Sequence, residues 1–132
     1  MTQIQNLKPG EAWQYMQDNP SAVLIDVRSK MEFAYVGHPR GALHIPWKEA
    51  PTWALNHDFV PDVKKEIPDK ETPVLLLCRS GQRSLAAANA LMEAGYTNLF
   101  NIDEGFEGAL DEEKHRGTSG GWRFHGLPWE QS

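Results

Sequence analysis

Residues 73–84 read PVLLLCRSGQRS, and this stretch carries the clearest indication of the fold. An apolar run of strand length, 73–78, ends at Cys78, the only cysteine of the chain, and leads through a polar loop into a helix-like segment. The run is apolar almost throughout, as a strand covered on both faces of a sheet should be. A buried strand followed directly by a helix is the repeating unit of α/β domains with parallel sheets.

The same alternation extends to both sides of this stretch. Three further runs of strand length occur, at residues 22–27, 42–45 and 98–102. Segments with apolar residues at helical spacing lie between them, at residues 10–18, 57–67 and 84–94, and Gly95 is placed to end the last of these. The pattern predicts an α/β domain with a mainly parallel sheet.

Composition indicates a single soluble globular domain. The chain has 132 residues, of which 40% are hydrophobic and 23% charged. It lacks a basic segment followed by an apolar run at its start, and no apolar stretch approaches the ~20 residues of a membrane helix, so we expect a cytoplasmic protein without a membrane partner. A net charge of −5 without a Lys/Arg-rich block argues against a nucleic-acid partner.

The chain is expected to divide into a domain over residues 1–116 and a short extension over residues 117–132. The extension begins with the glycine-rich sequence GTSGG and continues with an aromatic segment containing Trp122 and Trp129. We expect the glycines to act as a joint and the aromatic residues to pack on the same domain.

The loop after the central run has the features of an anion site. Ligands of parallel α/β sheets bind at the carboxyl ends of the strands, and the first N–H groups of a helix lack partners within that helix. With the helix dipole, these groups favour an anion. Arg79 and Arg83 add positive charge, and Gly81 supplies a residue that tolerates positive φ at the apex. We therefore expect Cys78 to be held largely as its thiolate, the nucleophilic form, and not as an inert buried thiol.

A lone cysteine limits what this thiolate can do. The chain can form no internal disulfide, and it has no second cysteine to resolve an oxidised or sulfur-bearing Cys78. Any sulfur chemistry must therefore finish on another molecule.

Three segments resemble the motifs of the rhodanese family, in the family's order. They are DVRSKMEF at 26–33, GHPRGA at 37–42 followed by Ile45-Pro46, and CRSGQRS at 78–84. The resemblance extends over roughly residues 4–110 and implies an open five-stranded, mainly parallel sheet flanked by helices, with Cys78 at the base of a shallow pocket. It also implies a sulfurtransferase of the thiosulfate type. In that reaction Cys78 takes a sulfur from a small anionic donor, holds it as a persulfide and passes it to a thiol or cyanide acceptor, with no separate cofactor.

The resemblance and the loop chemistry together assign roles to individual residues. Cys78 is the expected catalytic nucleophile. The expected substrate-binding and persulfide cradle consists of Arg79, Ser80, Gly81, Gln82, Arg83 and Ser84, of which Arg79 should lie nearest the mouth.

Two supporting residues come from the first motif. Asp26 is expected to pair with Arg83 across the top of the sheet, and Arg28 with Glu32, four residues further on in a short helix. A role for Arg28 in binding substrate is the weaker interpretation. Trp47 and Trp53 flank a proline-rich stretch, and either could wall the pocket or pack at its rim.

Three other functions are alternatives to sulfur transfer. Related folds in phosphatases and arsenate reductases use Cys-x5-Arg, whereas here Arg83 comes one position early and Ser84 occupies the expected place. A persulfide carrier or docking module fed by a protein partner stays open, because the sequence does not separate it from a thiosulfate enzyme. No metal is expected, because the histidines show no ligand spacing with one another or with Cys78.

Overall fold

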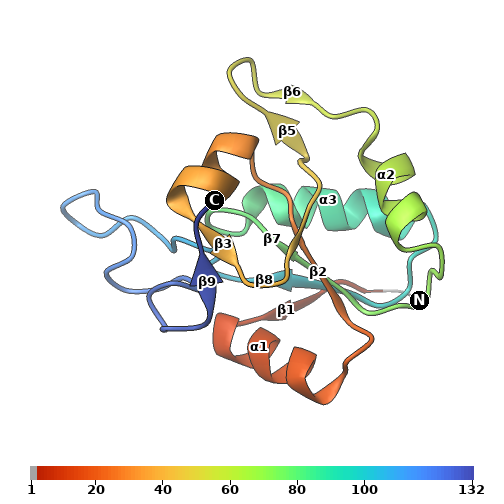
Figure 1. Ribbon diagram of the computed structural model, residues 1–132, viewed down its shortest axis with the longest axis horizontal. Helices are drawn as coiled ribbons and strands as arrows, with labels where there is room; N and C mark the ends of the chain where they lie inside the picture. Colours follow the sequence, from red (N-terminus) through yellow and green to blue (C-terminus); the bar gives the residue numbers. More distant parts are fainter. Residues whose placement is uncertain (1–2) are drawn as a thin grey trace.

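The apolar run 73–78 forms the central strand of a five-stranded sheet in the computed structural model, which describes residues 3–132 (Figure 1). The strands are β1 (Gln5–Leu7), β2 (Val23–Asp26), β4 (Leu43–His44), β7 (Val74–Leu77) and β8 (Leu99–Ile102). Their order across the sheet is β1-β8-β7-β2-β4, and every neighbouring pair is parallel. The predicted α/β fold with an open five-stranded sheet is confirmed. Strand β1 was not predicted, because its sequence QNL contains only one apolar residue.

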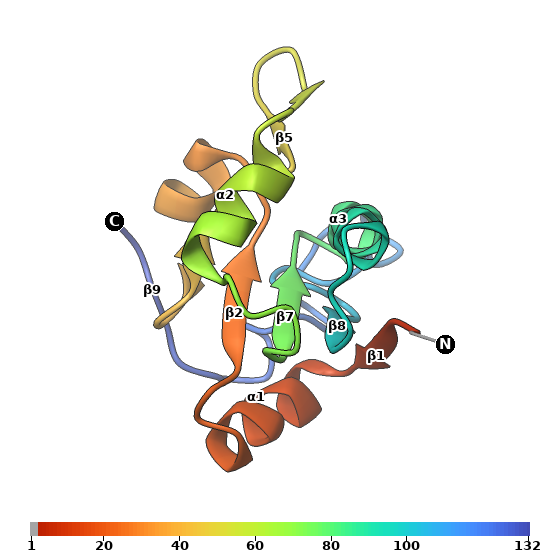
Figure 2. The same cartoon turned by 90° about the vertical axis from the view of Figure 1, so that its right-hand side faces the viewer.

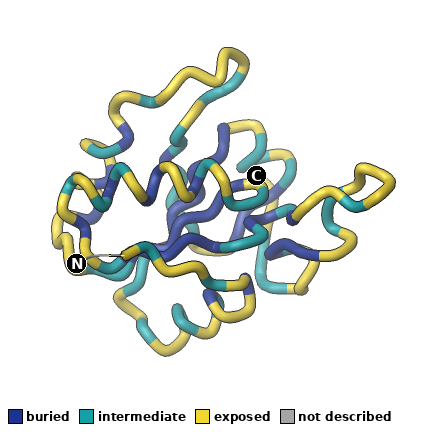
Figure 3. Tube along the Cα trace, turned by 180° about the vertical axis from the view of Figure 1, so that it is seen from behind, coloured by how far each residue is buried: buried dark blue, intermediate teal, exposed yellow. Residues whose placement is uncertain are grey.

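Helices cover both faces of the sheet. Helix α1 (Pro9–Asp18) lies on one side, and α2 (Phe59–Glu66) and α3 (Gln82–Glu93) lie on the other (Figure 2). Because alternate strand residues point to opposite faces, Val74 and Leu76 pack in the cluster with α2 and α3, while Leu75 and Leu77 pack in the cluster with α1. Burial is concentrated in the three inner strands, β2, β7 and β8 (Figure 3). No helix in this described part of the chain is long and apolar enough to span a bilayer.

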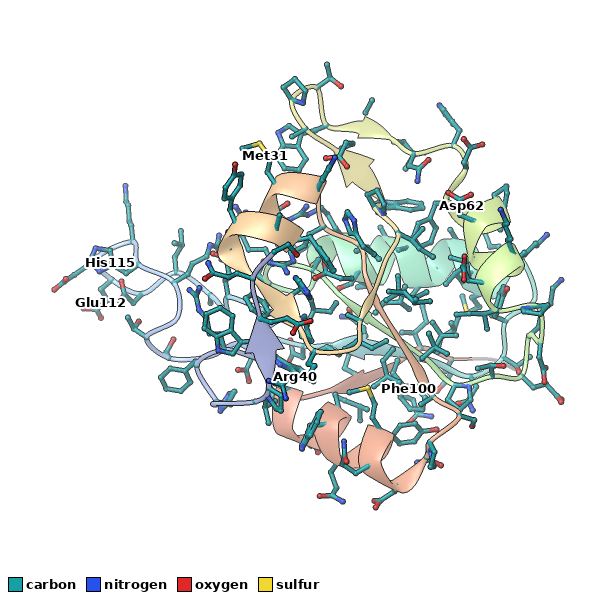
Figure 4. All side chains as sticks on the ribbon, viewed as in Figure 1. Met31, Arg40, Asp62, Phe100, Glu112 and His115 are labelled. Atoms are coloured by element: carbon teal, nitrogen blue, oxygen red, sulfur yellow. The ribbon has the colours of Figure 1, made fainter. Side chains whose placement is uncertain are left out.

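Several short elements lie outside the five-stranded sheet. A π-helix, η1 (Glu32–Val36), follows β2 and precedes β3 (His38–Pro39). Strands β5 (Lys48–Glu49) and β6 (Ala54–Leu55) form an antiparallel hairpin that projects from the body of the molecule (Figure 1). Met31, just before η1, lies beside the turn of this hairpin (Figure 4).

The segment after residue 117 packs against earlier parts of the chain. Strand β9 (Trp129–Glu130) pairs antiparallel with β3, and Trp122 is fully buried with its ring centroid 6.0 Å from that of Trp13 on α1. The Trp122 indole N–H also donates to the carbonyl of Pro128 at 2.9 Å. The loop that carries Glu112 and His115, by contrast, projects away from the sheet (Figure 4).

Candidate active site

Cys78 lies immediately after β7, at the carboxyl edge of the sheet. Its thiol is buried, and its Sγ accepts a hydrogen bond from the backbone N–H of Gly81 at 3.0 Å. Gly81 has a φ of 112°, the positive value that the sequence analysis expected. The loop therefore curls one amide onto the sulfur at the point where α3 begins. The backbone N–H groups in the first turn of α3 have no acceptor within the helix, so this end of the helix attracts an anion.

A second hydrogen-bond donor stands beside the sulfur. The Ser84 hydroxyl lies 3.3 Å from the Cys78 Sγ and also contacts the side-chain oxygen of Asn101. A hydroxyl has one hydrogen, and here it has two acceptors within reach. It can therefore turn from Asn101 toward the sulfur as negative charge develops there.

Asn101, on β8, supports the cradle from below. It is buried, and its side-chain amide donates to the Gly81 carbonyl at 3.2 Å and to the Asn6 side chain at 3.1 Å. Asn101 thus holds both residues that donate hydrogen bonds to the sulfur, Gly81 and Ser84. Asn101 was not predicted as a site residue, although one polar residue within the apolar run LFNI is a detectable signal of a buried hydrogen-bond network.

Arg83 is anchored by Glu32, not by Asp26. Its two terminal nitrogens each lie 2.8 Å from one carboxylate oxygen of Glu32, and both side chains are largely buried. Burial alone would raise the pKa of Glu32, but the bonds and charge of Arg83, together with Ser29, lower it from 4.5 to about 2. Burial also works against the Arg83 charge, but Glu32 and, less strongly, Cys78 and Asp26 raise the Arg83 pKa above its usual value. A permanent cation is therefore held at the recess next to the cysteine.

The expected pairs of Asp26 with Arg83 and of Arg28 with Glu32 are both wrong. Arg28 instead forms a two-point ion pair with Asp26, at 2.9 Å from Nε and 2.7 Å from Nη2, and both side chains are completely buried. The Ser29 hydroxyl and the Glu32 carboxylate bond to each other's backbone N–H, as in a capping box, and Arg83 occupies both carboxylate oxygens. Glu32 is therefore already paired and does not bind Arg28.

The complete burial of Arg28 also indicates a structural role for this residue. Its Nη2 donates to the Gly37 carbonyl, and its guanidinium lies 4.5 Å from the centre of the Phe106 ring. Neither Asp26 nor Arg28 lines a recess that reaches solvent near Cys78. Contact of Arg28 with substrate, the weaker interpretation from the sequence, therefore finds no support in this geometry.

The loop after β8 clamps the backbone of the cysteine loop. The N–H of Phe106 donates to the Cys78 carbonyl at 2.8 Å, and the N–H of Glu107 donates to the Arg79 carbonyl at 3.0 Å. This approach requires Gly105, because a Cβ at that position would lie 2.5 Å from the Cys78 carbonyl oxygen.

Two adjoining recesses open in front of the cysteine. The inner one, of about 190 Å³, is lined by Cys78, Arg79, Ser80, Gln82 and Arg83. The outer one, of about 400 Å³, shares Arg79 and Arg83 and adds Lys48 and Trp53 from the β5–β6 hairpin. Trp53 therefore walls the site, whereas Trp47 packs edge-on against Phe59 with the ring centroids 5.2 Å apart. Of the expected cradle, Gly81 and Ser84 thus contact the sulfur, while Arg79, Ser80, Gln82 and Arg83 line the recess beside it. Lys48 and Trp53 of the β5–β6 hairpin were not among the expected cradle residues.

Within residues 3–132, no three His, Cys, Asp or Glu side chains gather closely enough to hold a metal ion. Two histidines instead make contacts within the fold. His38 bonds the Phe33 carbonyl through Nδ1 at 2.8 Å, and His44 bonds the Arg28 carbonyl through Nε2 at 2.8 Å.

Comparison with known proteins identifies relatives along most of the chain. A family model described as a rhodanese-like domain matches residues 8–112. The crystal structure of Rv0390 from M. tuberculosis superposes with a TM-score of 0.89 and 41% sequence identity, covering 99% of this chain and 100% of that one. The thiosulfate sulfurtransferase GlpE of Haemophilus influenzae is 35% identical over 105 residues, which are 80% of this chain and 87% of GlpE. A Rickettsia rickettsii protein described as an RP600 homologue is 36% identical over an alignment of 131 positions that covers 96% of this chain and 98% of that protein.

Proposed function

The chain belongs to the rhodanese-like domain family, and from that premise we propose that it transfers a sulfane sulfur from thiosulfate, or another small anionic donor, to a thiol or cyanide through Cys78. The observation that carries the proposal is the bond from the Gly81 N–H to the Cys78 Sγ within the small inner recess. A buried thiol serving only as core packing would need neither the amide nor the recess.

The proposed first half-reaction loads the enzyme. The Cys78 thiolate attacks the outer sulfur of thiosulfate, the new S–S bond forms, and sulfite leaves with the electron pair of the bond that breaks. Cys78 then carries one extra sulfur as a persulfide. The Gly81 amide, the first-turn amides of α3 and the Ser84 hydroxyl would stabilise the negative charge on sulfur in the manner of an oxyanion hole.

The second half-reaction unloads it. The acceptor attacks the outer sulfur of the persulfide, and the electron pair of the broken S–S bond returns to Cys78 as thiolate. No cofactor besides the transient persulfide takes part in this cycle. Transfer to an external acceptor also agrees with the absence of a second cysteine in the sequence.

The position of Arg83 favours sulfur over phosphate as the transferred group. A phosphatase loop of this kind directs its arginine at the phosphate oxygens, whereas Arg83 directs both terminal nitrogens at Glu32. This geometry supports transfer of a sulfur atom and not of a phosphoryl group.

Mass spectrometry tests the proposal directly. After incubation with thiosulfate, the wild-type protein should gain the mass of one sulfur atom and lose it on addition of cyanide, while Cys78→Ser should gain none. Loading by a persulfide-bearing protein but not by thiosulfate would point to a carrier. A wild-type protein that gains sulfur from no donor would refute sulfur transfer altogether.

A further inference from the structure

The loop after β8, residues 103–108, lies between the cysteine loop and the C-terminal extension. On one side, the Phe106 N–H donates to the Cys78 carbonyl at 2.8 Å. On the other side, the Gly105 carbonyl accepts a hydrogen bond from the Trp122 N–H at 2.8 Å. The backbones of the cysteine loop, the 103–108 loop and the extension are therefore hydrogen-bonded in series.

These three backbones approach one another so closely that only glycine fits at the contacts. A Cβ on Gly105 would lie 2.5 Å from the Cys78 carbonyl oxygen, and a Cβ on Gly121 would lie 2.7 Å from the Gly108 nitrogen. No flexible side chain separates the layers at these points, and close-packed atoms transmit a displacement. A shift of the extension against the 103–108 loop should therefore reach the cysteine loop.

The Glu104 side chain ties the extension to the 103–108 loop. Its Oε1 accepts a hydrogen bond from the Gly121 N–H at 2.9 Å and lies 3.0 Å from Nε2 of His125. Its Oε2 lies 3.9 Å from Nζ of Lys8, the residue before α1. The Glu104 carbonyl accepts from the Gly108 N–H at 2.9 Å, which closes the loop on itself. One residue thus joins the loop, the extension and the start of a helix.

Glu104 is held in an unfavourable backbone conformation. Its φ is 74°, in the left-handed region where residues other than glycine are uncommon. Its nitrogen lies 3.9 Å from the position of a Cβ on Gly81, the residue whose amide bonds the Cys78 Sγ. Glycine would adopt this φ with less strain, so the strain is the cost of keeping a carboxylate at this position. Strain of this kind is found at functional sites, where the surrounding structure maintains it.

Resting on the sulfur transfer proposed above, we infer that Glu104 is a positioning residue for that reaction. It fixes the extension to the 103–108 loop, and this loop holds the Cys78 carbonyl so that the Gly81 amide stays directed at the sulfur. Glu104 lines neither recess in front of Cys78, so it acts only through the backbone.

The size of the effect follows from how steeply the chemistry depends on geometry. A misplacement of about 1 Å can slow a reaction about a hundredfold. Loss of the Glu104 carboxylate leaves the backbone hydrogen bonds between the layers in place, so the displacement should be partial. We therefore expect sulfur loading on Cys78 to slow by about tenfold.

Three substitutions of Glu104 separate positioning from stability. Glu104→Ala removes the carboxylate and keeps the backbone strain, whereas Glu104→Gly removes both. Glu104→Gln keeps an oxygen that can accept the Gly121 N–H. Glu113→Ala, an exposed position in the projecting loop, is the matched control.

Two rates are measured on each full-length protein at a temperature where circular dichroism shows it to be folded. The first is sulfur loading from saturating thiosulfate in a single turnover, followed by mass spectrometry. The second is alkylation of Cys78 by iodoacetamide, which needs the thiolate but no stabilised persulfide. The ratio of loading to alkylation cancels differences in thiolate fraction between the variants.

Glu104→Ala and Glu104→Gly should both lower this ratio by about tenfold, while Glu104→Gln should stay within about twofold of wild type. The glycine variant should nevertheless melt at a higher temperature than the alanine variant, because its backbone is relieved of strain. The thiosulfate concentration that gives half-maximal loading should not change, since Glu104 does not line the recesses. Glu113→Ala should change neither rate.

The outcomes also separate this inference from the proposed function. A wild-type ratio in Glu104→Gly would overturn the positioning role while leaving sulfur transfer intact, and so would ratios that simply follow the melting temperatures. A glutamine variant as slow as the alanine variant would overturn the role assigned to the bond with Gly121. Failure of the wild-type protein to gain sulfur from any donor would overturn the proposed function, and this inference with it.

Discussion

Replacing Glu32 with glutamine tests how the cysteine loop is anchored. The change keeps the shape of the side chain but removes the carboxylate that holds Arg83 through two bonds of 2.8 Å. Because Glu32 lies at the start of η1 and Arg83 in the first turn of α3, the substitution loosens the contact between η1 and the helix that follows the cysteine loop. We expect lower stability and slower loading of sulfur on Cys78.

The size of the expected loss of stability follows from the lowered pKa of Glu32. The pKa of Glu32 lies at about 2 in the folded protein, against 4.5 for an ordinary glutamate. This displacement corresponds to about 3 kcal/mol of folding free energy at neutral pH, at about 1.4 kcal/mol for each tenfold change in acidity. Because the folded-state pKa is depressed, this stability is fully present above pH 4.5 and is lost as the pH falls from 4.5 toward 2.

Urea unfolding at a series of pH values measures this contribution. The free-energy difference between wild type and Glu32→Gln should shrink by about 2 kcal/mol between pH 6 and pH 3, since protonation of Glu32 is not complete at pH 3. Other carboxyl groups titrate in both proteins and cancel in the difference. Glu71→Gln, an exposed position, serves as the control and should show no difference at either pH. A difference between wild type and Glu32→Gln that stays constant over this range would refute the assigned ion pair.

Three further substitutions test other parts of the structure. Asn101→Leu removes the buried amide beneath the cradle. It should lower the free energy of unfolding by about 1–3 kcal/mol, measured by urea unfolding, and slow sulfur loading, measured by mass spectrometry. Normal loading would argue against a positioning role for Asn101. Gly105→Ala places a methyl group 2.5 Å from the Cys78 carbonyl oxygen and should impair both folding and loading, whereas Gly41→Ala, also at positive φ but in open space, should cost only the backbone strain. Trp122→Ala empties a fully buried site and should cost about 3–5 kcal/mol in thermal or urea unfolding, while the fraction that stays folded still loads sulfur.

The sequence alone determined the core of the fold, because its signals are local. The apolar run at 73–78 and the helical spacing after residue 84 are periodicities that can be read within a few residues, and they correctly predict β7 and α3. The positive φ of Gly81 follows from the same local reasoning, since a tight loop needs it and glycine permits it. The parallel sheet then follows from the alternation of strands and helices.

Elements without a local signal were missed. Strand β1 has only three residues and one apolar side chain, so it is recognisable as a strand only by its pairing with β8. The contribution of Asn101 likewise depends on where β8 lies relative to the cysteine loop. Neither the pairing of β1 nor the contribution of Asn101 is encoded in a periodic pattern of the sequence.

The partners of the charged residues were decided only by the tertiary structure. Asp26, Arg28 and Arg83 all lie near the carboxyl edge of the sheet, and their order in the sequence does not say which carboxylate meets which guanidinium. Glu32 and Arg83 are 51 residues apart and meet because the fold brings the start of η1 to the first turn of α3. Trp53 and Lys48 reach the site in the same way, through the projecting hairpin. Charge attraction is not tied to sequence distance, so the folded arrangement of the elements selects the pairs.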